Sequence, residues 1–281
     1  MFSLPPMPPV KLTLPVIREF LHLQTSKKGR ILLDIAWDWM NQYHRTQNLI
    51  RNADKYCVET EIDKRIPFKP KDAKAYSLIV PQFFSLAKHF SIACIENQEV
   101  QEITDCFKYA NELAADVFKT IPTFMPRPTK HKDKALKFVQ YWDDPVNCCP
   151  SLHITYSVLA YNIGKSIIPP NEFQPYEKNM GAMFSSVLYT KQHAVVDVIY
   201  GMICANKAFT KTFPKQEFDD LTSKFDQLQI TYPDIPFSEI ATQYHQESDS
   251  GLTLPELVNQ EIVLSGKYQK LTHEECQQLI T

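Results

Sequence analysis

Glycine is scarce in this sequence: six glycines stand against twenty prolines in 281 residues. The two-residue turns of tight β-hairpins need residues that accept positive φ, above all glycine, so a glycine-poor chain has few of them. Alternating strand patterns are also few, and proline interrupts helices and favours the loops between them. We therefore predict a mainly α fold in which proline-marked loops separate the helices.

The cysteines form no framework either. The chain has seven of them, an odd number, and they are scattered and never spaced as CxxC, which argues against both a disulfide framework and a zinc site. The neighbours Cys148 and Cys149 are expected to be two packed thiols. Reduced thiols are typical of a cytoplasmic compartment.

A dominant charge and a membrane-spanning run are absent too. The formal net charge is −2, which gives no indication of a nucleic-acid-binding surface. No uncharged apolar run reaches the roughly 18 residues that span a bilayer, and the best candidate, residues 75–87, is shorter and contains a proline. The first 15 residues have no basic region followed by an apolar one, so no signal peptide is predicted.

Composition divides the chain into three predicted segments. These are residues 1–60, 61–209 and 210–281. The first is expected to be a proline-rich, extended lead-in over 1–15, followed by helices that pack on the core. The second is the predicted core and holds the two most apolar helical stretches, 148–164 and 180–209. The third is polar and acidic and is predicted to be a helical appendage, with a capping box at 272–275 that starts a last short helix.

Three short stretches carry polar residues of special interest. They read PRP at 126–128, PSLH at 150–153 and KQHAVVD at 191–197. Each alone has an ordinary explanation, namely a solvated loop arginine, a serine that caps a helix, and a core or surface histidine.

Taken together, the three stretches indicate an anion site. His193 and Asp197 are four residues apart and are predicted to lie on one helix face. The carboxylate would accept the Nδ1–H of the imidazole and leave Nε2 as a nucleophile. His153 is expected near the start of a helix, where amide N–H groups favour an anion. Arg127 and the lysines within 130–134 supply cations suited to phosphate.

These stretches resemble the three signature motifs of the type 2 phosphatidic acid phosphatase superfamily. That superfamily also contains the bacterial non-specific acid phosphatases, the vanadium haloperoxidases and the phosphosphingolipid synthases. The chain is most similar to its PSLH branch, which has inositol phosphorylceramide synthase-like members. The motifs PTFMPRP, VNCCPSLH and TKQHAVVDVIYG agree with that branch in order, spacing and loop context, and the resemblance covers residues 60–206.

The resemblance implies an all-α bundle of the haloperoxidase type and a phosphohistidine mechanism. His193 would attack phosphorus, oriented by Asp197, and His153 would protonate the leaving group and later activate the acceptor. Arg127 and the turn around Ser151 would bind the non-bridging oxygens. No metal or other cofactor is implied, because histidine, aspartate and fixed cations perform the chemistry. The substrate would be a phosphorylated small molecule or a lipid phosphate.

Two cationic positions of the superfamily differ in this chain. Its first motif has a lysine seven positions before the arginine, where this chain has Thr120, with Lys119 one residue away. Its third motif has an arginine six positions before the histidine, where this chain has Val187. Lys119 and Lys191 are therefore the expected replacements, although Lys191 reaches the pocket only if a helix begins near Thr190 or bends there.

Charged residues within the helices that correspond to the membrane spans of this branch predict a protein that does not cross the bilayer. It would be cytoplasmic or lie on a membrane surface, and a bacterial protein exported to act in a host cell is a further interpretation. Three functions stay open. These are a phosphatase or phosphotransferase working through phospho-His193, a non-catalytic phosphate- or lipid-binding protein with a degenerate site, and a vanadate-dependent haloperoxidase.

Overall fold

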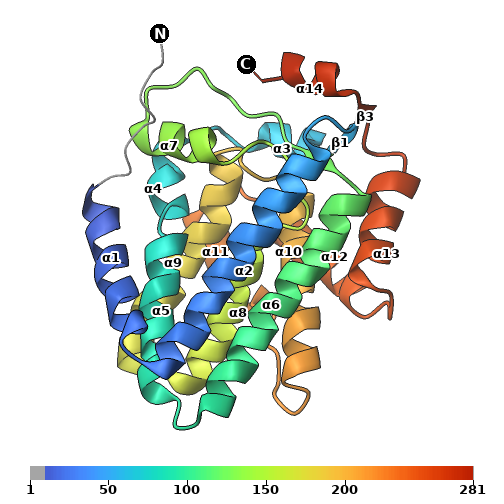
Figure 1. Ribbon diagram of the computed structural model, residues 1–281. Coiled ribbons are helices and arrows are strands. Elements are labelled where there is room, and N and C mark those ends of the chain that lie inside the picture. The colour runs from blue at the N-terminus through green and yellow to red at the C-terminus, as the bar shows by residue number, and fades with distance from the viewer. Residues whose placement is uncertain (1–9, 281) are drawn as a thin grey trace.

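The computed structural model describes residues 10–280, and helices dominate this part of the chain (Figure 1). Helices account for 71% of the structure and strands for 3%, which confirms the predicted all-α fold class. The α-helices within residues 10–280 are α1 (Val10–Gln24), α2 (Lys27–Ile50), α3 (Glu61–Arg65), α4 (Ala73–Tyr76), α5 (Ile79–Ala93), α6 (Asn97–Thr120), α7 (Lys134–Trp142), α8 (Leu152–Ile167), α9 (Pro170–Tyr189), α10 (Val195–Thr212), α11 (Phe225–Thr231), α12 (Phe237–Ser248), α13 (Leu254–Val258) and α14 (His273–Gln278). The other helical segments are the 3-10 helices Pro70–Asp72 and Thr222–Lys224 and the π-helix Asn259–Leu264.

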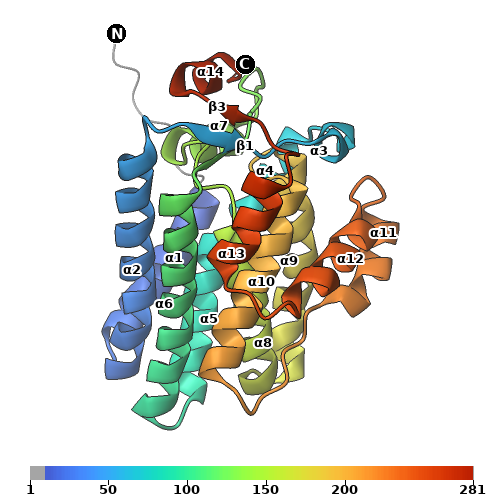
Figure 2. The same ribbon diagram turned by 90° about the vertical axis from the view of Figure 1, so that its right-hand side faces the viewer.

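The long helices pack side by side around one hydrophobic core. α2 lies along α6, α10 packs against both α6 and α8, and α9 packs on α8 (Figures 1 and 2). α12 and α13 pack against α10, with α11 and α12 at one edge of the molecule in Figure 2. A single cluster of buried apolar side chains runs from Leu23 in α1 to Ile262 near the C-terminus. The core therefore extends through all three segments that composition distinguishes.

The predicted extended lead-in is wrong for residues 10–15, where α1 has already begun. Residues 1–9 lie outside the described part. Pro15 falls inside the helix, where proline normally interrupts the hydrogen-bond ladder. Downstream packing outweighs this cost, because Leu23 is fully buried in the core and Phe20 makes an edge contact with Phe84 of α5, with 6.2 Å between ring centroids.

A small three-stranded sheet, which the sequence did not predict, joins distant parts of the chain. It contains β1 (Lys55–Cys57), β2 (Thr123–Phe124) and β3 (Lys270–Leu271) in the order β2-β1-β3. β1 and β2 are parallel, whereas β1 and β3 are antiparallel. The sheet fixes Thr123, whose hydroxyl oxygen accepts the backbone N–H groups of Cys148 and Cys149 at 3.0 Å each. The loop that leads into α8 is held in this way.

The start of the last helix follows its capping sequence. The predicted last helix is present as α14, and Thr272 and Glu275 form the expected capping box at its start.

Within residues 10–280, none of the helices combines the length and the apolar character that crossing a bilayer requires.

Candidate active site

His193 lies in a short break between α9 and α10. The sequence predicted one helical stretch over 180–209, and this is wrong, because the backbone turns between the two helices. Lys191 adopts a left-handed conformation, with φ of 55°. The amides of Gln192 and His193 then both donate to the carbonyl oxygen of Val187, at 3.1 Å each. The break takes the imidazole out of the regular helix.

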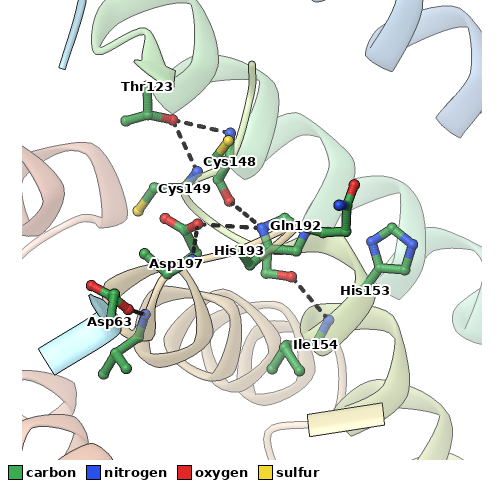
Figure 3. Close-up of polar contacts among 12 residues, drawn as sticks. Asp63, Thr123, Cys148, Cys149, His153, Ile154, Gln192, His193 and Asp197 are labelled. Carbon is green, nitrogen blue, oxygen red and sulfur yellow. Dashed lines mark hydrogen bonds and ion pairs between the residues drawn. The ribbon is translucent and has the colours of Figure 1, made fainter. Parts of the chain in front are cut away.

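Asp197 reaches His193 from the first turn of α10. Its Oδ2 accepts the backbone N–H of Ala194 at 2.8 Å and lies 3.3 Å from His193 Nδ1. Nδ1 is also 3.1 Å from the carbonyl oxygen of Cys148, and Figure 3 shows His193 between Asp197 on one side and His153 on the other. The predicted shared helix face is thus wrong. The two side chains meet because Asp197 turns back to cap its own helix.

The partners of Nδ1 define the tautomer of His193. A carbonyl oxygen and an ionised carboxylate only accept hydrogen bonds, so Nδ1 must carry the hydrogen. In the neutral ring, Nε2 then holds the lone pair, and no hydrogen-bond partner of Nε2 is found within residues 10–280. Both His193 and Asp197 are buried. The imidazole is therefore oriented with its nucleophilic nitrogen available.

The N-terminus of α8 supplies hydrogen-bond donors close to this ring. Ser151 is the N-cap residue of α8 and is fully buried. Its backbone N–H donates to the carbonyl oxygen of Asp197 at 2.9 Å, which links the starts of α8 and α10. The backbone N–H groups of Leu152 and His153 have no acceptor in the described part of the chain. Unpaired donors at the start of a 16-residue helix favour an anion.

His153 projects from this first turn toward His193. The ring centroids of the two histidines are 5.7 Å apart. Tyr76 of α4 stacks at a tilt on the other side of His153, with 4.1 Å between ring centroids, and its hydroxyl oxygen lies 3.3 Å from Nδ1. Burial, together with the neighbouring His193, lowers the pKa of His153 to about 3. The ring is therefore neutral at physiological pH.

Arg127 lies in the loop between β2 and α7 and is almost completely buried. Its Nη1 donates to the carbonyl oxygen of Asp143 at 2.6 Å and lies 3.2 Å from the Oδ2 atom of the same residue. Nη2 donates to the carbonyl oxygen of Gln192 at 3.3 Å. Nε is buried without a hydrogen-bond partner in the described residues. The guanidinium thus braces the break that carries His193 and keeps one donor unused.

A cavity of about 260 Å³ opens in front of the histidines. His153, His193 and Asp143 form its polar end. The remaining walls come from α2, α4, α5, α7 and α8 and are mainly aromatic and aliphatic. They include Trp39, Tyr43, Ile79, Phe83, Phe84, Trp142 and Tyr156. Within the described residues, no lysine or arginine side chain lines this cavity.

Two predicted phosphate ligands point elsewhere. Lys191 is buried, but its ammonium group donates to the carbonyl oxygen of Asp63, and burial lowers its pKa. Lys119 lies near the C-terminal end of α6, where its Nζ is 3.7 Å from a carboxylate oxygen of Asp116. The predicted site residues Arg127, Ser151, His153, His193 and Asp197 come together, whereas these two lysines do not join them.

Several residues of the site were missed in the sequence. Asp63 is buried and accepts the first backbone N–H of α10, from Val195, at 2.7 Å. Thr60 and Asp63 form a capping box at the start of α3, and this pattern is visible in the sequence. The contact of Asp63 with Val195, 132 residues further along the chain, is not visible there. Asp143 and Tyr76 have no local signal that would have placed them beside Arg127 and His153.

No group of three or more histidine, cysteine, aspartate or glutamate side chains suited to a metal ion occurs within the described residues.

No family model, no curated protein and no solved structure matches the chain. The function is therefore inferred from the geometry of the site.

Proposed function

We propose that this protein is a phosphatase or phosphotransferase that acts on a phosphomonoester or lipid phosphate through a phosphohistidine at His193. The observation that carries the proposal is the orientation of this imidazole. Its Nδ1 is committed to Cys148 and Asp197, at 3.1 and 3.3 Å, so Nε2 is the nitrogen left to react. A second histidine, His153, lies across the same end of the cavity.

In the proposed reaction, Nε2 of His193 bonds to phosphorus as the bond from phosphorus to the leaving oxygen breaks. His153 gives its proton to that oxygen. It then takes a proton from water or an alcohol, which attacks the phosphohistidine and frees His193. The unpaired amides of Leu152 and His153 are donors suited to the non-bridging oxygens. Arg127 does not line the cavity, and its buried guanidinium supports the site by holding the carbonyl oxygen of Gln192 next to His193.

His153 must be protonated for the first step. Its pKa is low because the ring is desolvated and lies next to His193. A phosphate dianion bound beside the ring favours the imidazolium and raises this pKa. Substrate binding would thus be coupled to proton uptake by His153.

A non-catalytic protein that binds a phosphorylated or lipidic ligand is the second candidate. It is favoured by the cavity lining, which includes no lysine or arginine side chain from residues 10–280, and by the ion pair that already engages Arg127 with Asp143. The same shortage of cations argues against a vanadate-dependent haloperoxidase, whose pocket needs several of them to hold vanadate.

The proposed function predicts that His193→Ala abolishes turnover. Release of inorganic phosphate is measured for phosphatidic acid, a sphingolipid phosphate, an inositol phosphate and an aryl phosphate, with a transferase assay for any silent substrate. Loss of the nucleophile should reduce the rate by about 10³-fold or more, and vanadate should inhibit the unmodified protein.

The matched control is His245→Ala, because His245 is exposed and lies on α12, away from the cavity. Both variants should unfold at temperatures close to that of the unmodified protein. Turnover that survives in His193→Ala would overturn the phosphohistidine mechanism. Vanadate binding that requires His193, with no turnover of any substrate, would favour the binding protein.

A further inference from the structure

The mouth of the cavity carries exposed apolar side chains. Val80 and Trp142 line it and are nevertheless 42% and 58% exposed. Met40 of α2 is 44% exposed and lies one helical turn from the lining residues Ala36 and His44. Large apolar side chains thus remain in contact with water where the cavity opens.

The exposed apolar surface continues onto α1. Phe20 contacts the lining residue Phe84, so α1 borders the cavity wall, and Figure 1 shows α1 beside α5. Leu14, Ile17 and Leu21 are also exposed. At three and four residues apart, they form one stripe that adjoins Phe20 and faces away from the buried side of α1. No described element covers this stripe.

A cluster of lysines flanks the apolar surface near α4 and α7, two helices that pack together. Six exposed lysines lie in residues 70–74 and 128–137, against the two carboxylates Asp72 and Asp133. They are Lys71, Lys74, Lys130, Lys132, Lys134 and Lys137.

None of the six has a hydrogen-bond or ion-pair partner within the described residues. Most other lysines of the structure do have one, such as Lys69, Lys165 and Lys224. The cluster is therefore a local positive patch on a chain of net charge −2.

We propose that this face, the stripe on α1 with the cavity mouth and the six lysines, docks on a bilayer that contains anionic lipids. The exposed apolar side chains would enter the boundary of the acyl chains. The unpaired lysines beside them would contact the anionic headgroups. Aromatic Tyr141 and Trp142, both exposed on α7, are suited to the interface between them. This inference concerns location and does not depend on turnover at His193.

Vesicle co-sedimentation of the full chain tests the proposal. Vesicles of phosphatidylcholine are compared with vesicles that also contain phosphatidylserine. The protein should bind the anionic vesicles more tightly by about tenfold or more, and added salt should weaken that binding, because several lysines contribute. Binding that is equal for both vesicle types, or absent for both, would overturn the proposal.

Two pairs of variants locate the surface. Lys134→Glu with Lys137→Glu should reduce binding to anionic vesicles by about tenfold or more, whereas the exposed control pair Lys178→Glu with Lys215→Glu should not. Leu14→Gln with Leu21→Gln should also reduce binding. Its control is Ile230→Gln with Leu264→Gln, at side chains that are 76% and 70% exposed on other faces.

The competing occupant of this face is a second copy of the chain. Light scattering separates the cases, because a dimer that the α1 variants dissociate, with unchanged vesicle binding, would overturn bilayer docking. His193→Ala is run in parallel and should bind vesicles as the unmodified protein does. Loss of turnover and loss of membrane binding are therefore independent results.

Discussion

At the scale of single residues, His193 shows how a correct pairing can have an unexpected structural origin. Spacing alone predicted that His193 and Asp197 are within reach, and Nδ1 and Oδ2 are 3.3 Å apart. The contact arises because the carboxylate caps α10 and the imidazole precedes it. Lys191, whose side chain was expected at the phosphate, instead follows the left-handed turn toward Asp63. Spacing along the sequence limits how far apart two side chains can be, but the direction of the backbone determines which residues each side chain contacts.

The low pKa of His153 predicts a pH-dependent stability. Its pKa is about 3 in the folded chain, against about 6.5 in an unfolded chain. Between these two pH values the unfolded state binds more protons than the folded state. The free energy of unfolding therefore decreases as the pH falls from about 6.5 toward 3. Between pH 7 and pH 5, His153 should cost the protein roughly 1–2 kcal/mol.

Urea denaturation of the unmodified protein and of His153→Gln at both pH values measures this effect. The stability of the variant should fall less on acidification, while His245→Gln, which changes an exposed histidine, should behave like the unmodified protein. Equal losses for the unmodified protein and His153→Gln would contradict the assigned shift.

At the scale of elements, the crossing of α8 and α10 sets the distance between the two histidines. Gly201 lies at this crossing, where an added Cβ would be 2.8 Å from the carbonyl oxygen of Ser151 and 3.0 Å from Cβ of Ile154. The hydroxyl of Thr155 donates to the Gly201 carbonyl oxygen at 3.0 Å. Only a residue without a side chain allows this approach, and the helices must separate for any other.

Gly201→Ala should therefore destabilise the protein by about 1–3 kcal/mol. It should also weaken vanadate binding, because the start of α10 and His193 just before it would move away from the start of α8. Gly181→Ala is the matched control within α9. There the new Cβ would meet only the end of the flexible Leu228 side chain, and the gain in helix propensity is about 1 kcal/mol. Thermal unfolding and vanadate titration measure both effects, and equal behaviour of the two variants would contradict the importance of the crossing.

At the scale of the whole molecule, the sequence predicted what depends on neighbours along the chain. Helical content, proline-marked loops and the α14 capping box are present because they depend on nearby residues. Contacts between distant segments were missed, such as Asp63 with Val195 and the sheet that joins β1 with β3. The break before α10 was missed for a related reason, since its residues look helical in isolation and turn because tertiary contacts hold them.

The continuous core predicts that the C-terminal helices are part of one cooperative unit. Phe237 of α12 is fully buried and packs on Phe225, with 5.0 Å between ring centroids, in the same cluster as the central helices. Phe237→Ala should lower the free energy of unfolding by about 3–5 kcal/mol, whereas Ile230→Ala, at a side chain exposed by 76%, should change it by less than about 0.5 kcal/mol.

Tryptophan fluorescence is the decisive measurement, since the tryptophans lie at positions 37, 39 and 142, far along the chain from α12. Their unfolding transition should shift with Phe237→Ala as much as the circular dichroism does. A fluorescence transition that stays in place would show that residues 210–281 unfold separately.

The free cysteines have a practical consequence for studying such opening events. All seven are unbridged, and they lie in or beside six different elements, β1, α5, α6, the loop before α8, α10 and α14. Burial raises the pKa of the Cys106 and Cys204 thiols to about 12, so neither reacts while its helix stays packed. The rate of alkylation at each cysteine, measured by mass spectrometry, would therefore show which part of the native protein opens first.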